Sequence, residues 1–155
     1  MKKIKALMKK TLFLLLTVLS ISCGLVSNNE EPSQLWITDV KEALIESKET
    51  GKPVFAFFTG KEWCSWCKKL DRQILQKENF INYAKENLIL LELDFPRGRR
   101  ELPQEQINLA RKFRIQGYPT VILMDAETNL LGQTGYENMS PQQYVAHIEK
   151  MISKK

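Results

Sequence analysis

Two cysteines three positions apart, Cys64 and Cys67, are the residues whose type and spacing indicate chemistry in this chain. Trp63 precedes the pair, and Ser65 and Trp66 lie between its members. At the start of a helix, two thiols at this spacing can close a small disulfide that reopens readily. Free backbone N–H groups and the positive end of the helix dipole stabilise a thiolate there, which lowers the pKa of the first thiol most. The pair therefore predicts redox chemistry.

A structural metal site or an inert disulfide is the alternative interpretation of the pair. A closed zinc site needs four ligands, and the sequence offers no second pair of cysteines. The third cysteine, Cys23, lies about forty residues upstream, and the single histidine, His147, lies in a C-terminal amphipathic stretch. We therefore expect no metal and no cofactor, and we expect no catalytic role for His147.

The segments on either side of the cysteines indicate a strand followed by a helix. Residues 54–59 are a short apolar run that ends at Gly60, which is typical of a strand. Residues 68–77 are polar, with apolar side chains at helical spacing. A strand is thus expected to deliver the cysteines to the N-terminus of a helix.

The rest of the chain alternates between the two kinds of element. Ser140 as N-cap and Pro141 at the first helical position predict the start of the last helix. Further helices are expected at residues 39–48, 78–87 and 104–113, and strands at 88–94, 121–124 and 130–134. This order calls for an α/β fold, with a mixed central sheet and helices on both faces.

The first 22 residues have the pattern of an export signal. Five lysines and no acid occur in residues 1–10, and residues 11–21 are almost wholly apolar. That run is too short to cross a bilayer of about 30 Å, which disfavours a permanent transmembrane anchor. We expect a signal peptide at residues 1–22, a polar tether at 23–33 and a folded domain at 34–155.

Without the leader, the chain has no excess of positive charge. The sequence holds 23 Lys and Arg against 18 Asp and Glu, and the five leader lysines account for the difference. A neutral mature protein does not favour nucleic acid as a partner.

Cys23 follows the apolar run, and residues 19–24 resemble the lipobox of bacterial lipoproteins, whose cysteine is acylated. The match departs from the usual pattern, because Ser20 stands three residues before the cysteine and Leu19 one further back. Small residues at Ser20 and Ser22 also suit ordinary signal peptidase. We predict a lipid anchor at Cys23, with simple cleavage as the alternative, and export to the periplasm in both cases.

From Trp36 to the C-terminus, the chain resembles the thioredoxin superfamily. Three parts agree in order and spacing, namely the approach to the cysteines, the apolar strand that ends at Asp94, and the segment 117–120 before the next strand. The resemblance implies that Pro119 is cis and faces the dithiol. It also implies that Trp63, Trp66, Tyr118 and Pro119 contact the substrate.

Two departures limit what the resemblance implies. Ser65 and Trp66 stand where thioredoxin has Gly-Pro, so the reduction potential is not fixed by analogy. Thioredoxin also buries a carboxylate beneath the dithiol as a proton acceptor, but the corresponding positions here are Phe57 or Phe58. Glu62 is near in sequence, yet it lies in a loop that we expect to be exposed.

Among superfamily members, the chain is most similar to exported bacterial thioredoxin-like proteins with a tryptophan between the cysteines. This implies a monomeric thiol–disulfide oxidoreductase, with Cys64 as nucleophile and Cys67 as resolving thiol. We expect a reductase of disulfide-bonded exported proteins, supplied by a membrane thiol–disulfide electron donor. The alternatives are a disulfide oxidase or isomerase, a non-catalytic lipoprotein that uses the fold for binding, and a metal chaperone.

Overall fold

The computed structural model describes residues 35–98 and 101–153. The predicted leader, the tether and Cys23 therefore lie outside the described residues. The elements are β1 (Trp36–Ile37), α2 (Val40–Thr50), β2 (Val54–Thr59), α3 (Ser65–Leu70), the π-helical turn η2 (Asp71–Leu75), α4 (Glu78–Asn87), β3 (Ile89–Asp94), α5 (Gln104–Lys112), β4 (Thr120–Met124), β5 (Leu130–Gly135) and α6 (Pro141–Ile152). Within this part of the chain, no helix is both long and apolar enough to cross a membrane.

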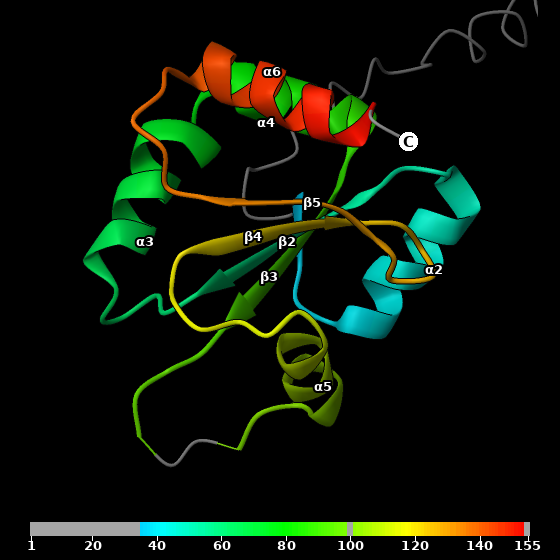
Figure 1. The fold of residues 1–155 in the computed structure, drawn as a ribbon, viewed down its shortest axis with the longest axis vertical. Helices are drawn as coiled ribbons and strands as arrows, with labels where there is room; N and C mark the ends of the chain where they lie inside the picture. Colours follow the sequence, from blue (N-terminus) through cyan, green and yellow to red (C-terminus); the bar gives the residue numbers. More distant parts are fainter. Residues whose placement is uncertain (1–34, 99–100, 154–155) are drawn as a thin grey trace, which may run out of the picture.

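The strands form one mixed sheet in the order β1-β3-β2-β4-β5. The central strand β2 runs parallel to β3 and antiparallel to β4, and the edge strands β1 and β5 pair with β3 and β4. The predicted mixed sheet is confirmed, and Figure 1 shows helices on both sides of it. Every residue of β2 is buried, as expected for a central strand that is covered on both faces.

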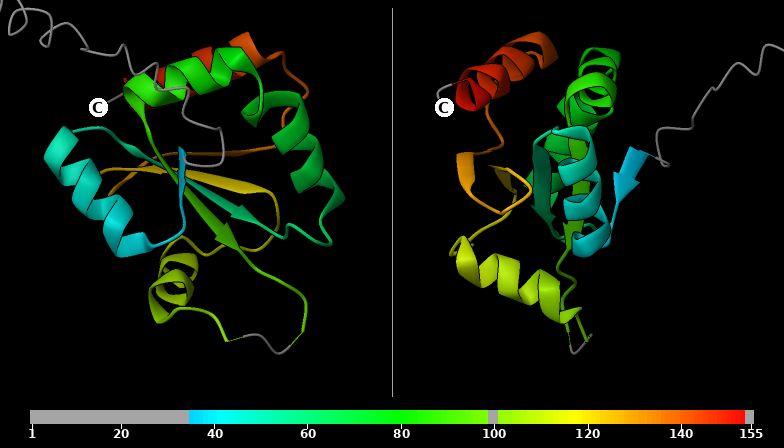
Figure 2. Two further views of the ribbon diagram at one scale, coloured as in Figure 1. Left: turned by 180° about the vertical axis from the view of Figure 1, so that it is seen from behind. Right: turned by 90° about the vertical axis from the view of Figure 1, so that its right-hand side faces the viewer.

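The two faces of the sheet carry separate cores. Successive side chains of a strand point to opposite faces, so Phe57 belongs to the core under α3, α4 and α6, whereas Phe58 belongs to the core under α2 and α5. We call these the dithiol face and the plain face, because Cys64 and Cys67 pack in the first core. Figure 2 shows α4 and α6 running side by side over the dithiol face.

Helix ends follow the signals in the sequence. Ser140 forms a complete capping box with Gln143 at the start of α6, and the Asp39 carboxylate accepts two backbone N–H bonds at the start of α2. Gly51 ends α2 in the left-handed conformation (φ 72°), which favours glycine. These local interactions explain why α2 and α6 begin where the sequence predicts.

Two elements differ from the sequence-based prediction. The strand β1 was not predicted, because two residues show no periodicity and their partners, Leu90 and Leu91, are distant in the chain. The helix after the cysteines is also not a single α-helix. It continues from α3 into η2, where the wider turn changes which side chains face the sheet.

Candidate active site

The turn between β2 and α3 places the cysteines at the carboxyl end of the central strand. The carbonyl of Gly60 accepts hydrogen bonds from the N–H groups of Trp63 (3.1 Å) and Cys64 (2.8 Å). The indole of Trp63 lies directly over Gly60, so that a Cβ atom there would come within 2.4 Å of the ring. Glycine is therefore required for this close approach, and the turn fixes the position of Cys64.

The sulfur atoms of Cys64 and Cys67 are joined as a disulfide, with 5.2 Å between the two Cα atoms. Cys64 is the N-cap residue of α3, and its Sγ accepts a hydrogen bond from the Cys67 N–H at 3.1 Å. Cys64 is 5% exposed and Cys67 is 2% exposed. The predicted placement at a helix start is confirmed, and the order of exposure is the expected one, although the difference is small.

The loop before β4 faces the same end of the sheet. The Tyr118–Pro119 peptide bond is cis, as the resemblance implies. The Thr120 hydroxyl donates to the Gly117 carbonyl at 2.8 Å, which closes the loop. Gly135 of β5 lies so close behind the loop that a Cβ atom there would be 2.8 Å from the Pro119 carbonyl oxygen. The loop is thus held against β5 by a direct backbone contact.

The tryptophans on either side of Cys64 have different surroundings. Trp63 is half-buried; its Nε1 donates to the Phe95 carbonyl at 2.8 Å, and its ring meets Tyr118 edge-on with 5.5 Å between centroids. Trp66 is 54% exposed and lies 5.2 Å from the Tyr136 ring. The structure therefore joins Trp63 and Tyr118 in one cluster and places Trp66 in another.

Each cluster carries a cation on its aromatic surface. The Arg97 guanidinium lies 4.8 Å from the Trp63 ring, and the Lys69 ammonium lies 4.9 Å from Trp66 and 4.8 Å from Tyr136. Such contacts hold long cationic side chains beside aromatic rings. Both clusters therefore present a surface that is aromatic and positively charged.

Beneath the disulfide, a small cavity of about 60 Å³ reaches Cys67. Glu92 of β3 enters it, and the Glu92 carboxylate forms an ion pair with the Lys61 ammonium at 2.6 Å. Asp71, the first residue of η2, also lines the cavity, and burial raises the pKa of its carboxyl. A bond from Gln76 and the charges of Lys61 and Arg72 oppose that rise in pKa.

The sequence analysis did not identify Glu92 and Asp71 as site residues, although two signals in the sequence point to them. Glu92 interrupts the apolar run of residues 88–93, and Asp71 stands four residues after Cys67, on the same side of a helix. Glu62, by contrast, is exposed, as expected. His147 is half-buried on α6, with its ring centroid 6.5 Å from that of Tyr144, and it does not line the cavity beneath the disulfide.

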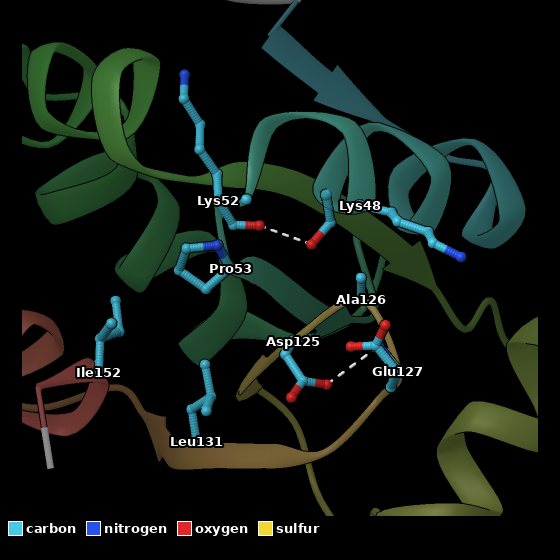
Figure 3. Close-up of a pocket in the computed structure, with 10 residues that line it drawn as sticks. Lys48, Lys52, Pro53, Asp125, Ala126, Glu127, Leu131 and Ile152 are labelled. Atoms are coloured by element: carbon cyan, nitrogen blue, oxygen red, sulfur yellow. Dashed lines mark hydrogen bonds between the residues drawn. The ribbon is translucent and has the colours of Figure 1, made fainter. Parts of the chain in front are cut away.

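A separate hollow of about 390 Å³ lies at the opposite end of the sheet, beside Pro53 and the turn after β4. Figure 3 shows Lys48 and Lys52 extending away from it. The Lys52 ammonium donates to the Lys85 carbonyl at 2.9 Å, and Asp125 accepts from the Asn129 side chain at 2.9 Å. Lys52 and Asp125, which line this hollow, therefore serve the local structure, and no cysteine lines it.

Among residues 35–98 and 101–153, no three His, Cys, Asp or Glu side chains are grouped so that they could hold a metal ion. The site brings together two sulfur atoms, aromatic surfaces beside them and an acidic cavity beneath them.

Comparisons with known proteins agree with this geometry. A family model for a thioredoxin-like domain matches residues 40–152. Disulfide bond reductase DsbH of Chlamydia pneumoniae is 36% identical over 115 residues, which cover 72% of this chain and 69% of the relative. Thioredoxin-related protein DsbJ of the same organism is 28% identical over 138 residues, which cover 87% of this chain but 38% of DsbJ. A solved structure of a DsbH oxidoreductase superposes with a TM-score of 0.70 at 34% identity, covering 77% of this chain and 85% of that one.

Proposed function

The chain belongs to the thioredoxin-like family, and from this premise we propose that it is an exported disulfide reductase that acts through Cys64 and Cys67. One observation carries the proposal: the two sulfurs form a disulfide at the start of α3, and the Cys67 N–H points at the sulfur of Cys64. A donor in this position stabilises the Cys64 thiolate once the disulfide is opened. The family and the cysteine pair together make the chain a thiol–disulfide oxidoreductase.

The proposed reaction is an exchange of disulfide bonds. The Cys64 thiolate attacks one sulfur of a substrate disulfide, forms a mixed disulfide and releases the other substrate sulfur as a thiolate. The Cys67 thiolate then attacks the Cys64 sulfur. The Cys64–Cys67 bond forms, the bond from Cys64 to the substrate breaks, and the electron pair leaves on the second substrate sulfur. Two electrons thus pass to the substrate, and an electron donor must return two to the enzyme.

The substrate is proposed to lie across the two aromatic clusters. The first, with Trp63, Tyr118 and the adjoining Pro119, lies beside the loop before β4, where an extended substrate backbone could pair as an added strand. The second exposes Trp66, which offers an apolar contact on the other side of Cys64. Disulfide-bonded exported proteins would meet both surfaces at once.

The direction of electron flow is part of the proposal. A 36% identical relative carries the name disulfide bond reductase, which favours reduction over oxidation or isomerisation. In an oxidising compartment, a reductase must be kept reduced, and a membrane thiol–disulfide electron donor would do so. The proposed lipid anchor at Cys23 would hold the enzyme beside such a donor in the periplasm.

Insulin reduction tests the activity. The full chain with Cys23→Ser, which leaves Cys64 and Cys67 as its only thiols, should reduce insulin disulfides in the presence of a small dithiol. Cys64→Ser should abolish this activity, and Cys67→Ser should accumulate the mixed disulfide. If Cys64→Ser still binds exported partners while the parent protein reduces nothing, the chain is a binding module that uses the fold without catalysis.

The proposed anchor at Cys23 requires a separate measurement. Stable attachment takes more than one acyl chain, because a single chain binds membranes only weakly. Mass spectrometry of the mature N-terminus from native membranes should find an acylated Cys23. An unmodified Cys23, or an N-terminus beyond it, would contradict the anchor but not the redox chemistry.

A further inference from the structure

A hollow of about 320 Å³ adjoins the aromatic cluster beside Cys64. Phe95 belongs to both, because it lines the hollow while its ring lies 5.5 Å from that of Tyr118 and its carbonyl accepts the Trp63 indole N–H. Gln116, two residues before Tyr118, also lines the hollow. The hollow is therefore continuous with the surface across which the substrate is proposed to lie.

The apolar walls of this hollow are fixed by the backbone. They consist of Phe95, Ile107, Ala110 and Ile115. The Ile115 N–H donates to the Ala110 carbonyl at 3.0 Å, which closes the turn after α5, and the Phe95 N–H donates to the Thr59 carbonyl at 2.8 Å. A preformed apolar hollow of this size has room for an apolar side chain of a bound polypeptide.

Three arginines surround the same part of the surface. Arg111 and Arg114 line the hollow, and the Arg97 guanidinium lies 4.8 Å from the Trp63 ring. All three side chains are exposed, and no Asp or Glu of the described residues forms an ion pair with any of them. No acidic residue lines the hollow either. Three positive charges thus stand beside the hollow without a negative partner in the part of the chain that the structure describes.

This positive charge is a local feature. Beyond the five leader lysines, the chain has as many acidic as basic residues, so a general excess of positive charge does not explain it. Positive charge gathered around a concave surface attracts negatively charged partners and speeds their association. The planar guanidinium group also suits carboxylates, which it can bind through two parallel hydrogen bonds.

We propose that the hollow between Phe95 and α5 is a specificity site for the substrate polypeptide. It takes an apolar side chain near the substrate cysteine, and Arg111 and Arg114 bind acidic side chains beside it, with Arg97 as a third positive charge on the approach. The enzyme therefore selects disulfide-bonded proteins whose cysteine lies in an acidic segment that also carries apolar side chains. This inference rests on the proposed reductase function and names its substrate class.

Peptides that carry one cysteine in a disulfide with a chromogenic aromatic thiol test the proposal. Cys64 of the reduced full chain with Cys23→Ser attacks the peptide sulfur, and the aromatic thiolate leaves as the coloured product, because the thiol of lower pKa is the better leaving group. The peptides contain a leucine and flanking glutamates, or the same leucine and flanking glutamines. Each second-order rate constant is divided by that of a small uncharged dithiol with the same peptide, which removes differences in intrinsic reactivity.

The glutamate peptide should react about tenfold faster than the glutamine peptide at low ionic strength, at the lower end of the range for electrostatic steering. This advantage should shrink as salt is added, because exposed charges are screened. Replacing the leucine by serine in the glutamate peptide should lower the rate about tenfold, because an apolar contact is lost. Equal rates for glutamate and glutamine, or for leucine and serine, would contradict the proposal.

Neutralising the arginines tests their role directly. Arg111→Gln combined with Arg114→Gln should reduce the advantage of the glutamate peptide to about twofold and weaken its dependence on salt. Lys48→Gln combined with Lys150→Gln is the matched control, because it removes two exposed charges that do not line the hollow, and it should keep the full advantage. Loss of the advantage in both double variants would assign it to net charge. Loss in Lys69→Gln alone would place the acidic segment at the cluster of Trp66. Either result would overturn the proposal.

Two other outcomes have separate meanings. If no peptide releases the aromatic thiolate faster with the parent protein than with Cys64→Ser, the proposed function itself fails. If the glutamate peptide has no advantage, and the parent protein but not the double arginine variant sediments with vesicles of anionic phospholipid, the arginines bind a membrane surface. The assignment of the hollow to a substrate polypeptide would then be wrong.

Discussion

The dithiol face and the plain face of the sheet are built from the same kinds of residue but differ in one respect. On the plain face, the buried polar side chains of α2 and α5 are Ser47 and Gln106, which carry no charge and donate hydrogen bonds to the carbonyls of Lys52 and Asp94. On the dithiol face, Glu92, Lys61 and Asp71 gather beside a comparably apolar cluster. Both faces stabilise the fold. Of the two, only the dithiol face has charged side chains partly removed from water beside its core, which opposes folding.

The comparison is informative because the buried polar side chains of the plain face carry no charge. The Glu92 side chain is 15% exposed and that of its partner Lys61 is 58% exposed, so the ion pair lies at the border of the core. Of the other five residues in its strand, four are leucine or isoleucine and the last is Asp94. A charged residue thus stands in the middle of the strand, on the face that carries the cysteines.

Truncating the neighbouring phenylalanines of β2 should have the largest effect and tests the comparison directly. Phe57→Ala and Phe58→Ala should each lower the free energy of unfolding by about 3–5 kcal/mol, since each empties a buried site. Only Phe57→Ala should also change the resolution rate, because Phe57 lines the cavity at Cys67. Urea unfolding measures the first effect. The second is measured with a chromogenic aromatic disulfide, which releases one coloured thiolate when Cys64 attacks and another when Cys67 resolves the mixed disulfide. Equal rates of the second release in both variants would remove the distinction between the faces.

Glycines around the loop before β4 provide a second test, of intermediate size. Gly135→Ala should cost about 1–3 kcal/mol, because the new methyl group meets the Pro119 carbonyl oxygen and forces a backbone shift. Gly117→Ala is the control, since nothing lies within 4 Å of the corresponding Cβ position. Thermal unfolding compares them. Similar losses in both variants would show that the contact between Gly135 and the loop is not tight.

The smallest expected effect concerns Asp71 and depends on pH. Burial raises the pKa of this carboxyl above its ordinary 3.8, so its ionisation at neutral pH opposes folding. The stability that this group contributes through its raised pKa is fully present below pH 3.8, where the carboxyl is protonated in both the folded and the unfolded state. That stability is lost as pH rises through the raised pKa of the folded state. Asp71→Asn should therefore stabilise the protein slightly at pH 7, while its amide oxygen can still accept the bond from Gln76.

Urea midpoints at neutral pH and near pH 3 would check this, because the difference between variant and parent should disappear in acid. A variant that is less stable at both pH values would mean that the carboxylate's own interactions outweigh its burial. The polar group would then be a stabilising feature of the dithiol face, contrary to the comparison.

The sequence predicted best those elements whose signals are local. Residues 54–59 lie between Pro53 and Gly60, and α6 begins with Ser140 and Pro141, so the bounds of β2 and α6 agree with the prediction. The redox role of the cysteine pair was predicted from its spacing and its place at a helix start, and the cis bond before Pro119 was implied by the resemblance to thioredoxin. These features need no knowledge of which strands are neighbours.

The remaining parts depend on partners that are distant in the chain. Grouping Glu92 with Cys67 requires the pairing of Glu92 with Phe57 and the knowledge of which face α3 covers. The different surroundings of Trp63 and Trp66 depend on Phe95 and Tyr136, which come from other segments. Such contacts follow from the register of the sheet, which sequence periodicity alone does not fix.

The shortness of β1 has a consequence for the protein at high concentration. β1 pairs only with Leu90 and Leu91, so no residue of it covers the outer edge of β3 from Glu92 to Asp94. An open strand edge invites a second copy to add its own strand, and charged side chains on that edge make such pairing unfavourable. The carboxylates of Glu92 and Asp94 stand on this uncovered stretch. The two acidic residues of β3 thus discourage the protein from aggregating edge to edge.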